Sequence, residues 1–187
     1  MGKEPLEFSI DDVEGSDEVI VALRSVQQSQ VRLNVLADQK ANINIGFTLL
    51  FITLSQTALV MDAAQQANVL RWGLILVNVS VALSLTLALL VVSPRISGSR
   101  IKKADQMSNP FYFGMFTQLD QGSYVDYMLT HLTRNQQARR MMLVDVYQIG
   151  QVLKRKYFLL RLSYGFLALS GILSAVMLAI KTLVYAP

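Results

Sequence analysis

The sequence predicts an all-α membrane protein with three transmembrane helices. Its 187 residues are 52% apolar, and the excess lies in three blocks, residues 41–61, 70–92 and 158–180. Each block is about 20 residues long, which is the length that a helix needs to cross about 30 Å of hydrocarbon. The Lys and Arg residues are concentrated between the second and third blocks. This uneven charge gives the three spans a defined orientation.

The N-terminal segment is acidic and differs from a secretory signal. The first 20 residues carry seven acids and one base, Lys3, whereas a signal peptide begins with a basic region. Residues 1–15 are therefore expected to form a flexible acidic tail. Ser16 is a good N-cap, and Asp17 and Glu18 suit the first turn of a helix. We predict a cytoplasmic amphipathic helix over residues 16–40.

This helix carries a coiled-coil-like stripe with one polar position, Gln30. The stripe recurs at alternating spacings of three and four residues, at Val19, Leu23, Val26, Gln30, Leu33 and Ala37. A polar seam position of this kind sets register and oligomer state. Two interpretations stay open: the stripe joins copies of the chain, or it packs on the chain's own loop.

No helix-breaking residue separates this arm from the first apolar block, so one long helix is expected to run from the arm into the first span. Asn42, Asn44 and Gln56 interrupt the apolar block at residues 41–61. Polar groups in a span usually face a bundle interior or water. The polar face either lines a pore formed by several copies or forms ordinary hydrogen bonds between helices.

The second span, residues 70–92, ends before Pro94, which cannot continue a helix. Between Arg95 and Arg161 there are eleven Lys or Arg residues and four Asp or Glu residues. By the positive-inside rule, this region and the N-terminus are cytoplasmic. Residues 93–157 are predicted to be a cytoplasmic basic region that forms a small helical hairpin between spans two and three. The loop between the first two spans and the C-terminus then lie on the other side.

Residues 109–116, NPFYFGMF, carry four aromatic side chains within eight positions. Pro110 and Gly114 indicate a turn rather than a helix interior. The aromatic rings either stack on a base or sugar ring or form a small core that holds the loop at the membrane interface. The single histidine, His131, is interpreted as a surface or packing residue.

Motifs for nucleotide hydrolysis, dinucleotide binding, metalloprotease chemistry and nucleophilic catalysis are missing from the sequence. The regions outside the spans are small for a conventional enzyme domain. We therefore expect a protein that is not an enzyme and has no catalytic residues, metal site or cofactor. The chain has no cysteines, which excludes disulfide and thiol chemistry.

Four stretches in this order resemble a bacterial family, the Pycsar membrane effectors (PycTM). They are ADQKAN at residues 37–42, NPFYFG at residues 109–114, the stretch from Asp145 to Ile149, and Lys156-Tyr157 before the last span. The resemblance covers roughly residues 30–180. It implies an antiphage effector in the bacterial inner membrane, encoded beside a pyrimidine nucleotide cyclase. Cyclic CMP or cyclic UMP would activate it, and membrane damage would cause abortive infection.

The resemblance carries over residue by residue to a limited set of candidate ligand-binding positions, which are Asp38, Lys40, Asn109, Phe113, Asp145 and Lys156. A cyclic nucleotide carries one negative charge, a planar base and a ribose. Lys40 or Lys156 would meet the phosphate and Phe113 would stack on the base. Asn109 or Asp145 would bond the ribose or the base edge.

Asp38 and Lys40 have a second interpretation, as an ion pair that locks neighbouring subunits. No separate nucleotide-binding domain is evident. The hypothesis is therefore a pocket formed by NPFYFG, the basic helix end and the ADQKAN turn. The expected partners are the lipid bilayer and further copies of the chain, with no nucleic acid polymer. The alternative function is a non-enzymatic membrane scaffold or an accessory subunit of a transporter or channel.

Overall fold

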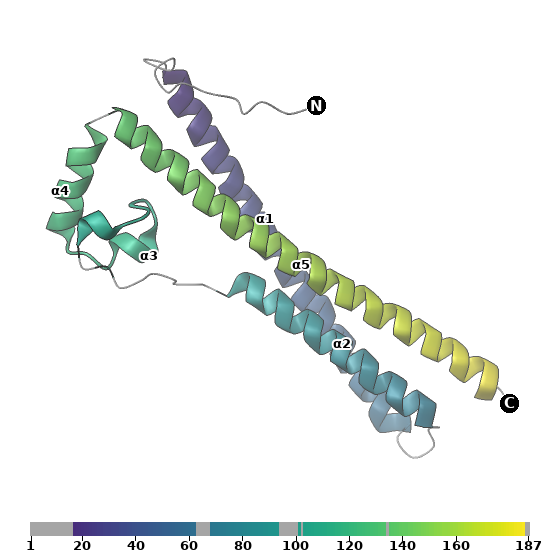
Figure 1. Ribbon diagram of the computed structural model, residues 1–187. Helices are drawn as coiled ribbons and strands as arrows, with labels where there is room; N and C mark the ends of the chain where they lie inside the picture. Colours follow the sequence, from purple (N-terminus) through teal and green to yellow (C-terminus); the bar gives the residue numbers. More distant parts are fainter. Residues whose placement is uncertain (1–16, 63–67, 94–100, 102, 134, 186–187) are drawn as a thin grey trace, which may run out of the picture. The chain divides into compact units, whose positions relative to one another are not determined.

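A computed structural model describes the chain apart from residues 1–16, 63–67, 94–100, 102, 134 and 186–187 (Figure 1). The predicted acidic tail at residues 1–15 therefore lies outside the described residues. All regular elements of the described part are helical. They are α1 (Asp17–Asp62), α2 (Asn68–Val92), the 3-10 helix η2 (Ala104–Gln106), α3 (Phe113–Phe116), α4 (Gln121–Leu132) and α5 (Asn135–Tyr185).

The long N-terminal helix is confirmed as one continuous element. α1 has 46 residues and runs from the acidic arm through the ADQKAN stretch into the apolar block without a break. α5 is also continuous over 51 residues, so the helix of the basic region extends into the last apolar block. The polar residues at 136–140 belong to the start of α5, because α4 ends at Leu132 with Thr133 as its C-cap.

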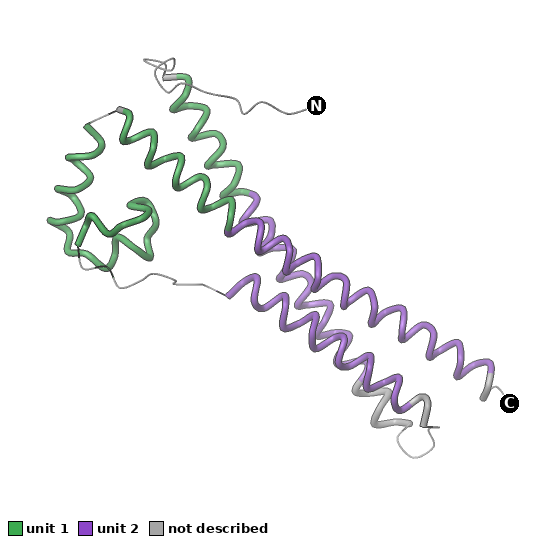
Figure 2. The backbone as a smooth tube through the Cα atoms, in the orientation of Figure 1, with its two compact units in different colours: residues 1–32, 96–151 green, residues 33–95, 152–187 purple. Residues whose placement is uncertain are grey.

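The described chain divides into two compact units (Figure 2). Unit 1 contains residues 1–32 and 96–151, and unit 2 contains residues 33–95 and 152–187. α1 and α5 each contribute residues to both units. The two units are described separately below.

In unit 1, the segment that contains NPFYFG folds through local hydrogen bonds. The backbone N–H of Ile101 donates to the Gln118 side chain at 2.9 Å. The Tyr124 hydroxyl donates to the carbonyl of Pro110 at 3.2 Å, and the Tyr124 ring stacks on Phe116 at 5.0 Å. Asp120 caps α4 by accepting the backbone N–H of Ser123. The segment is therefore held without a large apolar core.

Unit 2 is a helical bundle of α1, α2 and α5 with small or polar side chains inside. In α2 the buried positions follow spacings of three and four residues, as in left-handed coiled coils; they are Val77, Val81, Ser84, Ala88 and Val91. α1 contributes Ala37, Ala41, Asn44 and Thr48, and α5 contributes Leu160, Ser163 and Ser170. These side chains let the helices approach closely.

The outer surface of unit 2 is apolar. On α1, Phe47, Leu50 and Leu54 are 60%, 62% and 71% exposed, although large apolar side chains are usually buried in soluble proteins. Polar side chains inside and large apolar side chains outside are typical of a bundle surrounded by lipid.

Within the chain, α1 covers only part of the predicted apolar stripe. Ala37 is buried and Gln30 is half-buried, but Val26 and Leu33 are 46% and 39% exposed. The better-covered series on α1 passes through the half-buried Gln27, Gln30 and Asn34 to the buried Ala37 and Ala41. The sequence interpretation selected the apolar residues, whereas the chain turns the neighbouring amides inward.

Two helices in the described residues are long and apolar enough to span a membrane, within the segments Arg71–Val92 and Gln136–Leu183. These agree with the second and third predicted spans. No such segment is found in α1 over its described side chains, which end at Ser55 and leave out the last residues of the predicted span. Its apolar half, residues 41–61, stays a predicted span.

Candidate functional site

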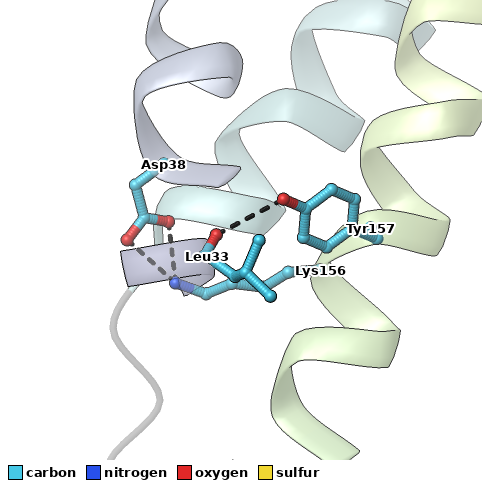
Figure 3. A network of polar contacts seen from close by, with 4 residues as sticks. All are labelled: Leu33, Asp38, Lys156 and Tyr157. Carbon is cyan, nitrogen blue, oxygen red and sulfur yellow. Dashed lines mark hydrogen bonds and ion pairs between the residues drawn. The ribbon is translucent and has the colours of Figure 1, made fainter. Parts of the chain in front are cut away.

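A charged cluster lies at the start of the unit 2 bundle, where α1 meets α5 (Figure 3). The Lys156 ammonium donates to both carboxylate oxygens of Asp38, at 2.7 and 3.0 Å. The side chain of Lys156 is 19% exposed and that of Asp38 is 36% exposed. The pair is therefore partly withdrawn from water. We call Asp38, Lys40, Lys156 and Tyr157 the charged cluster.

The helical repeat places these residues. Asp38 is adjacent to the buried Ala37 and lies three residues before the buried Ala41. Lys156 lies four residues before Leu160, which packs with Ala41 and Val91 in the apolar centre of the unit. Residues three and four apart share a helix face. Both charges therefore sit at the end of the same α1–α5 seam.

Two tyrosines of α5 bond the α1 backbone beside this pair. The Tyr157 hydroxyl donates to the carbonyl of Leu33 at 3.5 Å (Figure 3), and the Tyr164 hydroxyl donates to the carbonyl of Lys40 at 3.0 Å. The Lys40 ammonium lies 5.8 Å from the centre of the Tyr157 ring, within cation–π range. Lys40 is exposed, so the cluster presents one accessible cation and one paired cation.

A second polar cluster lies in unit 1 around Asp145, which is 5% exposed. Its carboxylate accepts from the side-chain amides of Gln27 on α1 and of Asn109, the latter at 2.8 Å. Asn109 also donates to Gln148 at 3.1 Å, and its oxygen accepts the backbone N–H of Phe111 at 3.0 Å. These bonds attach the NPFYFG segment to α1 and α5.

This second cluster holds the NPFYFG segment in place through hydrogen bonds, and we call Asn109 and Asp145 with their partners the structural latch. Asn109 is 1% exposed, and both its amide nitrogen and its oxygen have partners within unit 1. A buried side chain whose bonds are already made has little capacity left for a ligand. The geometry therefore gives Asn109 and Asp145 a positioning role.

Phe113 differs from the latch because it is 57% exposed. Its ring is tilted against Tyr112, with the centroids 5.1 Å apart. Phe116 stacks on Tyr124 and so serves the local core. Phe116 therefore packs locally, and stacking of Phe113 on a base stays a prediction. His131 stacks on Tyr127 at 4.0 Å, as a packing residue does.

Of the six candidate residues, the structure pairs Asp38 with Lys156 and Asn109 with Asp145. Within the chain, Asp38 bonds Lys156 and Lys40 lies over the Tyr157 ring; an Asp38–Lys40 pair between neighbouring subunits stays a prediction. Ligand binding by the six residues stays a prediction. Sequence reasoning did not single out Gln27 or Gln148; Gln27 belongs to a polar series with Gln30 and Asn34 at helical spacing, which was the available signal.

The described residues contain no group of three His, Cys, Asp or Glu side chains suited to a metal. The comparison with protein families matches the PycTM model, described as the Pycsar effector protein domain, over residues 21–184. The chain belongs to the Pycsar effector family. The comparisons with curated proteins and with solved structures each gave no significant match.

Membership of the Pycsar effector family implies a role as an antiphage effector and a functional link to a system that produces a cyclic nucleotide. It also agrees with the two apolar helices in indicating a membrane protein. The match indicates a non-catalytic effector family and no enzymatic one.

Proposed function

We propose that this Pycsar effector is a ligand-gated protein of the bacterial inner membrane. Cyclic CMP or cyclic UMP activates it, and the active form impairs the membrane and aborts phage infection. The observation that carries the gating proposal is the Asp38–Lys156 ion pair, which joins α1 to α5 at the start of the bundle.

The inside-out packing of unit 2 supports a third span in α1. Ile43, Phe47, Leu50 and Leu54 are all more than half exposed, and Asn44 and Thr48 are fully buried. Exposing these large apolar side chains to water would be unfavourable, whereas lipid solvates them. Three spans place the N-terminus in the cytoplasm and the C-terminus on the other side.

The charged cluster suits recognition of a phosphate monoanion. Lys40 is exposed, and Lys156 is held only by a carboxylate that an anion would replace. The Tyr157 ring beside Lys40 supplies an aromatic face. A cyclic nucleotide that takes Lys156 from Asp38 removes the bond between the two helices.

The free energy needed to switch the protein to its active state is compatible with a few hydrogen bonds between the nucleotide and charged side chains. A switch from 1:99 to 99:1 needs a ligand that prefers the active state by about 5.5 kcal/mol. Hydrogen bonds to charged groups contribute about 1.5–3 kcal/mol each. One nucleotide supplies most of the difference, and assembly of several copies would sharpen the response.

The proposal is tested by calorimetry of the purified full chain in detergent against cyclic CMP, cyclic UMP, cyclic AMP and cyclic GMP. We expect binding of one or both pyrimidine nucleotides only. Lys40→Ala and Lys156→Ala are each expected to weaken binding, by about tenfold for a lost contact of about 1.4 kcal/mol.

Lys154→Ala is the matched control, because Lys154 is a neighbouring and exposed base on α5. It is expected to leave affinity unchanged at physiological salt, since screening weakens distant surface charges. If Lys154→Ala and Lys156→Ala weakened nucleotide binding equally, the loss of affinity would come from net charge rather than from a specific contact. Binding of none of the four nucleotides would contradict the proposal.

A further inference from the structure

A file of buried polar groups runs through unit 2 along α1. It begins with Asn34 and the Asp38–Lys156 pair, continues through Asn44 and Thr48, and reaches Ser55, which donates to Asn78 of α2 at 3.2 Å. From residue 34 to residue 55 the helix advances about 30 Å at 1.5 Å per residue. The part of it within the predicted span, residues 41–55, covers about 20 Å of the roughly 30 Å of hydrocarbon. We call this file the polar seam.

The centre of the polar seam links the three helices of the unit. The Asn44 amide donates to the Ser163 hydroxyl of α5 and lies 3.5 Å from the Ser84 hydroxyl of α2. Ser84 and Ser163 each donate to the other's backbone carbonyl, at 2.8 and 2.7 Å. All three side chains are 0% exposed. This layer closes the seam in the present conformation.

One oxygen in this layer has no partner. Asn44 Oδ1 is buried without a hydrogen bond, and so is Asn34 Oδ1 at the start of the seam. A buried polar atom left unpaired costs about 1–3 kcal/mol. A membrane bundle has no packing need for such atoms, because alanine or leucine would fill the same places. Unpaired oxygens directed into the seam indicate that it accommodates water or a cation in another conformation.

We propose that in the active state the polar seam is hydrated and conducts protons and small monovalent cations across the membrane. This inference rests on the proposed function and specifies how the membrane is impaired. Water replaces the hydroxyl and amide bonds of the closed layer one for one, so hydration is far less unfavourable than in a leucine-lined seam. Neutral oxygens replace the hydration shell of a cation, as in known filters.

The mouth of the seam accounts for the choice of cations. In the closed form Lys156 neutralises Asp38 at this end. When an anionic ligand binds Lys156, the Asp38 carboxylate is released beside the seam and attracts cations. Ligand binding and ion entry are thereby coupled through one carboxylate.

The absence of cysteine from the chain permits a direct test. The full chain carrying Thr48→Cys is reconstituted in liposomes loaded with K⁺ and the dye calcein, and exposed to cyclic CMP and, separately, cyclic UMP. Leu50→Cys is the matched control, because Leu50 lies two residues away on α1 and is 62% exposed on the apolar surface. A charged, water-soluble thiol reagent is added before and after the nucleotide.

We expect nucleotide-dependent K⁺ efflux without calcein release. The reagent modifies Thr48→Cys only after activation and lowers efflux about tenfold, because a group added within a narrow path obstructs it. It leaves Leu50→Cys unmodified. Thr48→Ser keeps the hydroxyl and has no thiol, so it conducts K⁺ and is not affected by the reagent. This control separates obstruction of the path from misfolding caused by a substitution at this position.

Two results would overturn the inference and leave the proposed function standing. One is release of calcein as fast as K⁺, and the other is efflux with Thr48→Cys unmodified. A chain that binds nucleotide and leaves the liposomes sealed to both K⁺ and protons would instead contradict the proposed membrane damage itself.

Discussion

At the scale of single residues, partial burial decides what the charged and amide side chains contribute. An exposed ion pair contributes about 0–1 kcal/mol, whereas breaking a buried pair costs about 3–5 kcal/mol. The Lys156 and Asp38 side chains are 19% and 36% exposed and lie between these limits. The pair is strong enough to join two helices and weak enough for a ligand to compete with it.

Asn109→Ala tests the structural latch of unit 1. The change removes the three hydrogen bonds of a buried amide, one of them to the Asp145 carboxylate. Since hydrogen bonds to charged groups contribute about 1.5–3 kcal/mol, we expect a loss of about 2–3 kcal/mol in unfolding free energy. Thermal unfolding in detergent and protease sensitivity of the NPFYFG segment measure it.

Ser108→Ala is the control for this change, because Ser108 is adjacent and exposed. Its effect on stability should stay within about 0.5 kcal/mol, as for most surface substitutions. If Asn109→Ala kept full stability and lost only nucleotide affinity, the residue would be a ligand contact rather than a latch.

At the scale of elements, the capping groups and the contacts of each helix face account for where helices begin and how they pack better than apolar periodicity does. α4 begins where Asp120 accepts the Ser123 backbone N–H at 2.8 Å. α5 contains two glycines in its apolar part, Gly165 and Gly171, and an added methyl group at either would meet no atom within 4 Å. Those glycines are not close-contact positions within the chain.

The Asp120 cap predicts a pH effect at the start of α4. The hydrogen bonds from the backbone N–H and side chain of Ser123 hold the pKa of the Asp120 carboxyl below its usual value. A lowered pKa in the folded state means that the cap stabilises α4 above the unfolded pKa and that this stability is lost as pH falls through the folded pKa. The amide shift of Ser123 in ¹⁵N-labelled protein should follow that titration.

Asp120→Asn is the matched control, because asparagine also caps helices and does not titrate in this range. It should retain the protected first turn of α4 at neutral pH and show a flat Ser123 profile in acid. An unchanged acid titration of Ser123 in Asp120→Asn would assign the effect to another group.

At the scale of the whole molecule, the number of spans determines where the two ends of the chain lie. The positive-inside argument and the apolar outer surface of α1 both favour three spans. An odd number of spans puts the termini on opposite sides of the membrane, and an even number puts them on one side. The location of the termini therefore decides whether α1 crosses.

We expect a C-terminal alkaline phosphatase fusion to be active in cells, because that enzyme folds only outside the cytoplasm, in an oxidising compartment. A green fluorescent protein fused to the N-terminus should be fluorescent in the same strain. Both reporters on one side would exclude the span in α1. A phosphatase fused after residue 106, within the basic region, is the inactive control.

The sequence by itself determined the helical class, the continuity of α1 and α5, the apolar blocks of α2 and α5, and the family. These features depend on local composition and on short motifs in a fixed order. It also marked Asp38, Lys156, Asn109 and Asp145, but as individual residues without partners.

Only the tertiary structure decided the pairing. Asp38 and Lys156, and equally Asn44 and Ser163, are more than 100 residues apart in the chain. Which of two adjacent residues on α1 turns inward depends on the helices that face it. For that reason the half-buried amides of Gln27 and Asn34 took the inner positions that apolar periodicity assigned to Val26 and Leu33. In a bundle surrounded by lipid, apolar side chains gain little from being inside, and polar side chains gain partners there.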